Sequence, residues 1–200
     1  MATSIPLIDF QHYGLHVENT ETVSNEDLKQ LGEEIHEAFS SIGFCYIKNH
    51  GIPQEMVWPD ADLPQMRKIF YDFFEICKKM AFRILEVLGV GLKLEDRDFL
   101  RQCHQNIGNK NQTTLRSLMY PPLPTDGSIL PGQVRCGEHS DYGTVTMLFQ
   151  DDIGGLEVCN TAGDYIQATP VSGAICVNIG DLMQRWTADK LMATVSMDTI

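Results

Sequence analysis

A histidine and an aspartate two positions apart, His139 and Asp141, are the residues of this sequence best suited to chemistry. Side chains two positions apart on an extended segment point to the same side, so the imidazole and the carboxylate can bind one metal ion. Fe(II) is commonly held by two histidines and one carboxylate. No histidine follows His139 in the sequence. The pattern therefore predicts an iron site together with a ligand set that this sequence does not complete.

Composition and charge restrict the class of protein that carries this pair. The 200 residues are 43% hydrophobic, which predicts one soluble domain with a sizeable core. A net charge of -12 argues against nucleic acid and anionic membrane as partners. No apolar run is long enough to span a bilayer and no secretory signal is visible. Six scattered cysteines predict reduced thiols and a cytoplasmic location, while the oligomeric state stays open.

The first half of the sequence has the apolar period of helices. This period predicts helices over residues 25–42, 63–88 and 95–103. Ser24 is expected as the N-cap of the first helix, and Gly89 is expected to end the second. A short strand is expected after the first helix. These elements predict a helical layer ahead of the metal-ligand pair.

After residue 111 the pattern changes from helix to strand. Short runs rich in valine, isoleucine, threonine and leucine alternate with glycine, proline and aspartate turns. The runs predicted as strands cover residues 113–120, 144–149, 156–159, 165–168, 174–179 and 191–195. Helices followed by short antiparallel strands that carry a metal site predict an α+β fold with a jelly-roll or cupin-like barrel.

Five further motifs accompany the His139–Asp141 pair. They are residues 5–10 (IPLIDF), 43–53 (GFCYIKNHGIP), 118–122 (LMYPP), 155–158 (GLEV) and 177–181 (VNIGD). Together they resemble the iron- and 2-oxoglutarate-dependent dioxygenase superfamily, in particular its isopenicillin-N-synthase-like branch. The resemblance covers most of the chain, and the motif around NHGI is highly specific.

The resemblance implies a fold, an activity and a set of site residues. The fold would be a double-stranded β-helix behind an N-terminal helical layer, divided into a dioxygenase N-terminal-like region, 1–110, and a partial barrel, 111–200. The activity would be that of an oxidoreductase, an O2-dependent oxidation of a small organic substrate with 2-oxoglutarate as co-substrate. His139 and Asp141 would be ligands of Fe(II), and Tyr120 would reach the co-substrate.

Two departures from the family pattern predict a shortened member with impaired activity. Ser196 stands at the position of the family's distal histidine ligand, and the arginine of its R-x-S motif would lie beyond Ile200 with the last strands of the barrel. A segment that the family has between positions equivalent to Val57 and Trp58 is also absent. A splice form or a partial gene model would have this appearance.

Alternative interpretations stay open for the third ligand and for the function. Asp198 lies two positions from Ser196 and would share its face of a continuing strand, so it could complete a site for Fe or Mn, although chain ends fray. A non-catalytic truncated isoform that acts as a binding or regulatory protein, or an unstable partial product, is the alternative function. His50 is expected to be structural, His104 to lie on the surface, and Asn178 to fix a turn.

Overall fold

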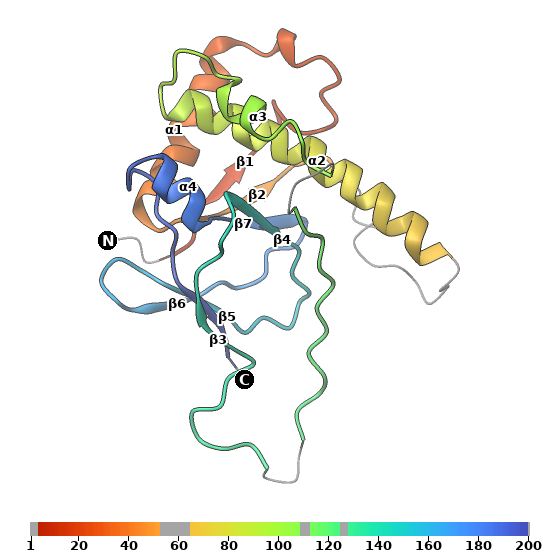
Figure 1. Cartoon of the computed structure of the whole chain (residues 1–200), viewed down its shortest axis with the longest axis vertical. Coiled ribbons are helices and arrows are strands. Elements are labelled where there is room, and N and C mark those ends of the chain that lie inside the picture. The colour runs from red at the N-terminus through yellow and green to blue at the C-terminus, as the bar shows by residue number, and fades with distance from the viewer. Residues whose placement is uncertain (1–3, 53–64, 109–112, 125–127, 200) are drawn as a thin grey trace.

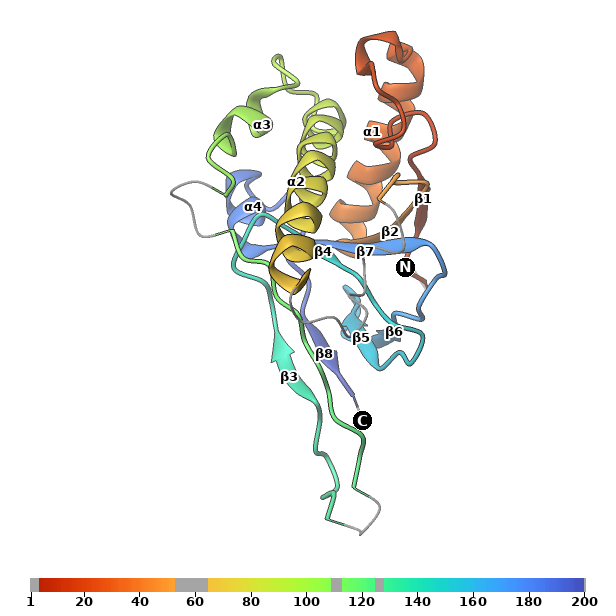
Figure 2. The ribbon, with the colours of Figure 1, turned by 90° about the vertical axis from the view of Figure 1, so that its right-hand side faces the viewer.

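Helices from the first half of the chain lie over a pair of four-stranded sheets (Figures 1 and 2). The computed structural model describes residues 4–52, 65–108, 113–124 and 128–199. The expected junction between Val57 and Trp58 lies outside the described residues. Within the described part of the chain, no helix is long and apolar enough to cross a membrane.

The first sheet joins strands from both halves of the sequence. Its order is β1–β2–β7–β4, with β1 parallel to β2 and the other pairs antiparallel. The bounds are β1, Leu7–Asp9; β2, Phe44–Lys48; β7, Ala174–Ile179; and β4, Val145–Leu148. The amino-terminal region therefore contributes two strands to the sheet as well as the helices that cover it.

The second sheet is antiparallel throughout and comes from the carboxyl-terminal half alone. Its order is β3–β8–β5–β6. The bounds are β3, Cys136–His139; β8, Ser196–Asp198; β5, Leu156–Cys159; and β6, Tyr165–Gln167. Two facing sheets of short strands with helices ahead of them confirm the predicted α+β fold of the jelly-roll type.

The α-helices of the described residues accompany the sheets. They are α1, Asn25–Ser41; α2, Met66–Gly91; α3, Phe99–Cys103; and α4, Asp181–Trp186. The Oγ of Ser24 accepts a hydrogen bond of 3.0 Å from the N–H of Asp27, so the predicted N-cap is confirmed. The prediction that Gly89 ends α2 was wrong, since the helix continues to Gly91.

Glycine at positions 89 and 91 serves close packing rather than helix termination. A Cβ on Gly91 would lie 2.2 Å from the carbonyl oxygen of Gly32 in α1, and a Cβ on Gly89 would lie 2.5 Å from the carbonyl oxygen of Arg97. Both distances are far below van der Waals contact. The two long helices therefore approach backbone to backbone at this crossing.

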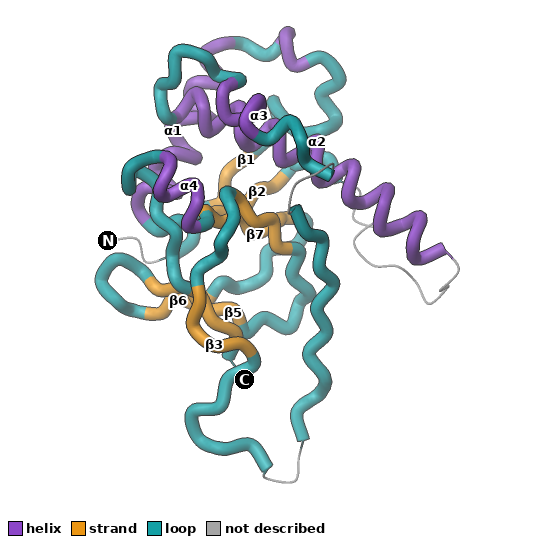
Figure 3. Tube along the Cα trace, viewed as in Figure 1, coloured by secondary structure: helices purple, strands orange, loops and turns teal. Residues whose placement is uncertain are grey.

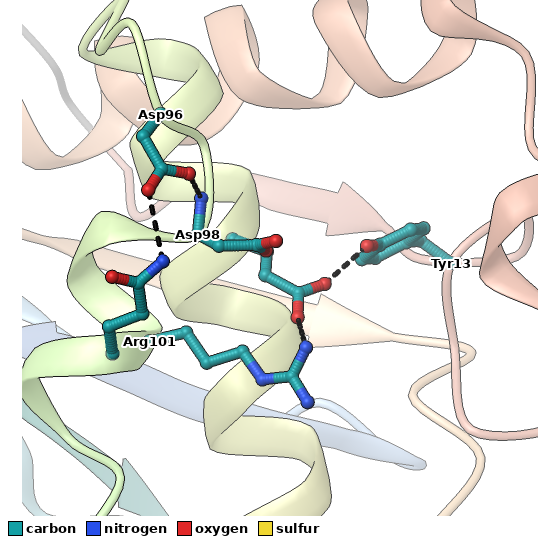
Figure 4. A network of polar contacts seen from close by, with 6 residues as sticks. Tyr13, Asp96, Asp98 and Arg101 are labelled. Carbon is teal, nitrogen blue, oxygen red and sulfur yellow. Dashed lines mark hydrogen bonds and ion pairs between the residues drawn. The ribbon is translucent and has the colours of Figure 1, made fainter.

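A buried polar network ties the amino-terminal loop to the helices (Figure 4). The hydroxyl of Tyr13 donates to Glu86 of α2 at 2.5 Å, and Arg101 of α3 donates to the other carboxylate oxygen at 2.8 Å. Glu86 is a buried carboxylate, so these two donors satisfy the charge that burial would otherwise make costly. Burial and the Glu86 carboxylate both raise the pKa of Tyr13.

The central strands β2 and β7 separate two apolar cores. Ile47 and Val177 face the larger core beneath α1 and α2. Tyr46 and Cys176 face a smaller core that lies between the two sheets. Because successive side chains of a strand point to opposite faces, both strands are buried on both faces, which explains their nearly continuous apolar sequences.

Two predicted strands are absent at the expected places. Residues 113–120 are extended but form no ladder (Figure 3), and residues 191–195 contribute only a bridge from Ala193 to Ile179. The strand at that end of the chain is β8, which begins at Ser196. Propensity alone placed these strands, whereas the formation of a ladder depends on which segments of the fold lie alongside.

Candidate metal centre

His139 and Asp141 lie side by side at the end of β3. His139 is the last residue of the strand, and Asp141 follows two residues later. Nε2 of His139 and Oδ1 of Asp141 are 4.0 Å apart, and both side chains remain partly open to solvent. Metal–donor bonds of about 2 Å place two adjacent donors of one ion about 3 Å apart. A small side-chain rotation would close the difference.

The imidazole of His139 is held so that one nitrogen is free. Its Nδ1 lies 2.9 Å from the carbonyl oxygen of Gly137. A carbonyl only accepts, so the proton sits on Nδ1 and donates to Gly137. In the neutral tautomer with this proton, Nε2 carries the lone pair, and Nε2 is the atom that lies 4.0 Å from Oδ1 of Asp141. Histidines that bind metals usually donate their other ring N–H to a carbonyl or carboxylate in this way.

The carboxylate of Asp141 is held in the same manner. Nδ2 of Asn178 donates to Oδ2 of Asp141 at 2.7 Å, and the backbone N–H of Asp181 donates to the Asp141 carbonyl at 2.7 Å. Oδ1, the oxygen that faces His139, is left available. In each member of the pair, one side-chain atom is therefore fixed by a hydrogen bond, and the other atom is available to bind a metal ion.

Asn178 belongs to the candidate site through its hydrogen bond to Asp141, a contact that the sequence interpretation missed. It was expected to fix a turn, but it lies inside β7 and is only 6% exposed. A lone polar residue in the otherwise apolar run Ala174–Ile179 was the available signal. A buried amide in such a strand needs hydrogen-bond partners, and the Asp141 carboxylate is the partner that it has.

Ser196 occupies the place directly across from His139. The two residues are register partners in the antiparallel pair of β3 and β8, and side chains at such positions have Cβ atoms about 4.5–5.5 Å apart. A serine hydroxyl is a weaker ligand for Fe(II) than an imidazole. In the described part of the chain no group of three His, Cys, Asp or Glu side chains is arranged to hold a metal ion. The residues present thus fit two ligands of an iron site.

Asp198 is held by other partners than His139 and Asp141. It is the register partner of Cys136, and its Oδ2 accepts a hydrogen bond of 2.7 Å from the hydroxyl of Tyr120. Burial, followed by the bond to Asp198, raises the pKa of Tyr120 to about 12. Tyr120 therefore stays a protonated donor at neutral pH.

Two of the remaining histidines have structural contacts. His50 is buried, and its Nδ1 accepts from the N–H of Ile52 at 3.0 Å. His104 was expected on the surface, but it is only partly exposed. Its ring nitrogens lie 2.6 Å from the carbonyl oxygen of Leu100 and 2.8 Å from Oγ1 of Thr144. His104 thus connects the end of α3 to the start of β4.

Two family models match the chain. Residues 98–195 match the 2OG-Fe(II) oxygenase superfamily, and residues 5–80 match the non-haem dioxygenase in morphine synthesis N-terminal family. The first match includes His139 and Asp141 and ends immediately before Ser196. The two matches together cover most of the chain, and the chain belongs to the 2OG-Fe(II) oxygenase superfamily.

The named relatives of this chain include a dioxygenase and a proline hydroxylase. The chain is 38% identical over 138 residues to the 2-oxoglutarate-dependent dioxygenase htyE of Aspergillus rugulosus, an alignment that covers 67% of this chain and 40% of htyE. It is 36% identical over 142 residues to the proline hydroxylase buaE of Petromyces alliaceus, covering 68% of this chain and 42% of buaE. The chain thus spans about two fifths of the length of these relatives.

Solved structures share the fold at low sequence identity. A full-length Neurospora crassa protein solved in complex with alpha-KG has a TM-score of 0.79 at 23% identity, over 98% of this chain and 78% of that chain. The rice dioxygenase for auxin oxidation has a TM-score of 0.70 at 18% identity, over 98% of this chain and 78% of that chain. These likenesses confirm the double-stranded β-helix.

Proposed function

We propose that this chain is the metal-binding part of an Fe(II)- and 2-oxoglutarate-dependent oxidoreductase that acts on a small organic substrate. The observation that carries the proposal is the facing pair of free donors, Nε2 of His139 and Oδ1 of Asp141. Each is oriented by a hydrogen bond through its other atom. The named relatives, dioxygenases and a proline hydroxylase, support the same chemistry.

The chain's own residues position the reactants. His139 and Asp141 would hold the ion, Asn178 would fix the carboxylate, and Tyr120 would donate to a carboxylate of the co-substrate. When bound, Fe(II) with 2-oxoglutarate supplies the oxidation by O2, and the protein supplies orientation. The division into residues 1–110, which contribute β1, β2 and the covering helices, and residues 111–200, which carry the ligands, is part of the proposal.

We place the substrate among small organic molecules in the cytoplasm rather than among nucleic acids or membrane lipids. The net charge of -12 supports this choice, because it repels polyanions and anionic surfaces.

Metal titration and turnover test the proposed function. Calorimetric titration with Mn(II), a redox-stable stand-in for Fe(II), should show one site whose affinity is lost in His139→Ala and in Asp141→Ala. The matched control is His12→Ala, which removes an exposed imidazole elsewhere. With Fe(II), ascorbate and 2-oxoglutarate, we expect no succinate above that of His139→Ala, because Ser196 stands opposite His139 where a third imidazole ligand would be needed. Equal Mn(II) affinity in the native chain and His139→Ala would contradict the proposal.

Replacing Asn178 by alanine should weaken the site without removing a ligand. The Asp141 carboxylate would lose the hydrogen bond to Oδ2 and rotate more freely. Loss of a residue that hydrogen-bonds to a metal ligand typically costs about 10- to 100-fold in metal affinity. The measurement is the Mn(II) dissociation constant, with far-UV circular dichroism as a check on folding. Gln167→Ala, an exposed amide in β6, should leave the constant unchanged; a similar loss there would point to a general effect on the fold.

A further inference from the structure

The segment that carries Asp141 is held by hydrogen bonds rather than by packing of its own side chains. It joins β3 to β4 over residues 140–144. Tyr142 is 92% exposed, and a Cβ at Gly143 would meet nothing within 4 Å, so neither position anchors the backbone. A glycine also leaves the backbone unusually free to change conformation. The place of the Asp141 carboxylate therefore depends on the hydrogen bonds that hold this segment.

The start of α4 holds the backbone carbonyls of the segment. The N–H of Asp181 donates to the carbonyl of Asp141 at 2.7 Å. The N–H groups on either side of Asp181 donate to the carbonyls of Gly143 and Thr144 at 3.1 Å each. These bonds restrain the main chain of the segment toward α4, and the Thr144 side chain is left to contact another element.

His104, at the end of α3, holds the segment through the Thr144 side chain. Nδ1 of His104 lies 2.6 Å from the carbonyl oxygen of Leu100, and since a carbonyl only accepts, Nδ1 donates. In the neutral tautomer with this proton, Nε2 accepts from the Thr144 hydroxyl at 2.8 Å. The ring of Trp186, at the end of α4, packs against the imidazole with the ring centroids 5.7 Å apart (Figure 2). The orientation of the imidazole is therefore fixed by α3 and α4 together.

We propose that His104 is a positioning residue for Asp141, and that its hydrogen bond with Thr144 fixes the segment on which the carboxylate is carried. His104 acts through Thr144, three residues from Asp141, rather than by touching the ion. A ligand set must be held to within about 0.5 Å of its productive geometry, so a small shift of the segment lowers metal affinity. The effect on a metal ion rests on the proposed function, whereas the restraint on the segment is a property of the metal-free chain.

Two amide replacements of His104 separate positioning from a general effect on stability. A glutamine side chain reaches the place of Nε2 and can accept from Thr144, whereas an asparagine side chain reaches only the place of Nδ1. Both replacements lose the ring contact with Trp186, so a purely structural role predicts the same loss in each.

Calorimetric titration with Mn(II) measures the difference between the two variants. His104→Asn should weaken Mn(II) binding by about tenfold, the lower end of the effect of a residue that hydrogen-bonds to a metal ligand. His104→Gln should keep most of the native affinity. His12→Asn, which removes an exposed imidazole elsewhere, should have no effect. Equal affinities in His104→Gln and His104→Asn would overturn the proposal.

A double-mutant cycle tests whether the effect passes through Thr144. Thr144→Val keeps the shape of the side chain and removes the hydroxyl, so it should weaken Mn(II) binding as much as His104→Asn does. The two substitutions together should weaken binding no more than either one alone, because they remove the same hydrogen bond. Additive losses would contradict a role that passes through Thr144.

Amide hydrogen exchange of the metal-free chain tests the restraint without an ion. The N–H of Leu182, which donates to the segment, should exchange about tenfold faster in His104→Asn and in Thr144→Val, the equivalent of one lost hydrogen bond. The N–H of Ala168, which donates to the carbonyl of Leu156 in β5, is the reference for global unfolding. No change at Leu182, or an equal change at both N–H groups, would overturn the proposal. If the native chain bound no Mn(II) but exchange at Leu182 still rose, the proposed function would fail and the restraint would stand.

Discussion

Ser196→His is expected to raise the affinity of the chain for Mn(II) by more than about 100-fold. Residues that only hydrogen-bond to a metal ligand change the metal affinity by about 10- to 100-fold. An imidazole that binds the ion directly contributes more. Position 196 is the register partner of His139, so an imidazole there would face the ion that His139 and Asp141 bind. The two histidines and one carboxylate would complete the set that suits Fe(II).

Calorimetric titration of the native chain and Ser196→His measures this gain. Ser172→His adds an imidazole at an exposed position away from the pair and should bind Mn(II) no better than the native chain. In Ser196→His, the additional substitution His139→Ala should remove the gain. A gain that persists without His139 would show that the new histidine binds metal somewhere else.

Gly180→Ala should damage both stability and metal binding. A Cβ at this position would lie 2.3 Å from the carbonyl oxygen of Gly143 and 2.8 Å from that of Asp141. Both are backbone atoms, so the segment that carries Asp141 must move. Overpacking of this kind costs about 1–3 kcal/mol or more, and displacement of Asp141 should also weaken Mn(II) binding by at least the effect of Asn178→Ala.

Thermal unfolding and Mn(II) titration of Gly180→Ala check both effects. The control is Gly143→Ala in the segment between β3 and β4 that Gly180 contacts, because a Cβ at Gly143 would meet nothing within 4 Å. Alanine there should be neutral or slightly stabilising, since it restricts the unfolded chain. If Gly180→Ala is as stable as Gly143→Ala and binds Mn(II) as tightly, the close contact at Gly180 is not what positions Asp141.

The sequence predicted the elements whose signals are local. The apolar period of residues 25–42, with Ser24 as N-cap, led to α1, and the runs at 156–159 and 174–179 led to β5 and β7 within their observed bounds. In each case the local signals, such as the helix cap, the apolar period and the flanking turns, predict the same element. Local patterns are reliable under this condition.

The errors arose where structure depends on partners distant in the sequence. Residues 113–120 have strand propensity, but they are not incorporated into either sheet. β8 is only three residues long, and it exists because it pairs with both β3 and β5. The hydrogen bonds of Asp141 to Asn178 and of Asp198 to Tyr120 join residues 37 and 78 positions apart, and no short motif encodes such distances.

β7 makes the metal pair and the helical layer parts of one cooperative unit. Its Val177 packs into the core under α1 and α2, while the adjacent Asn178 holds Asp141. Any opening that frees the helices from the sheet therefore also releases the aspartate. An ion bound by the folded form alone stabilises that form by mass action, so metal should slow amide hydrogen exchange in α1 and α2, which have no contact with the ion.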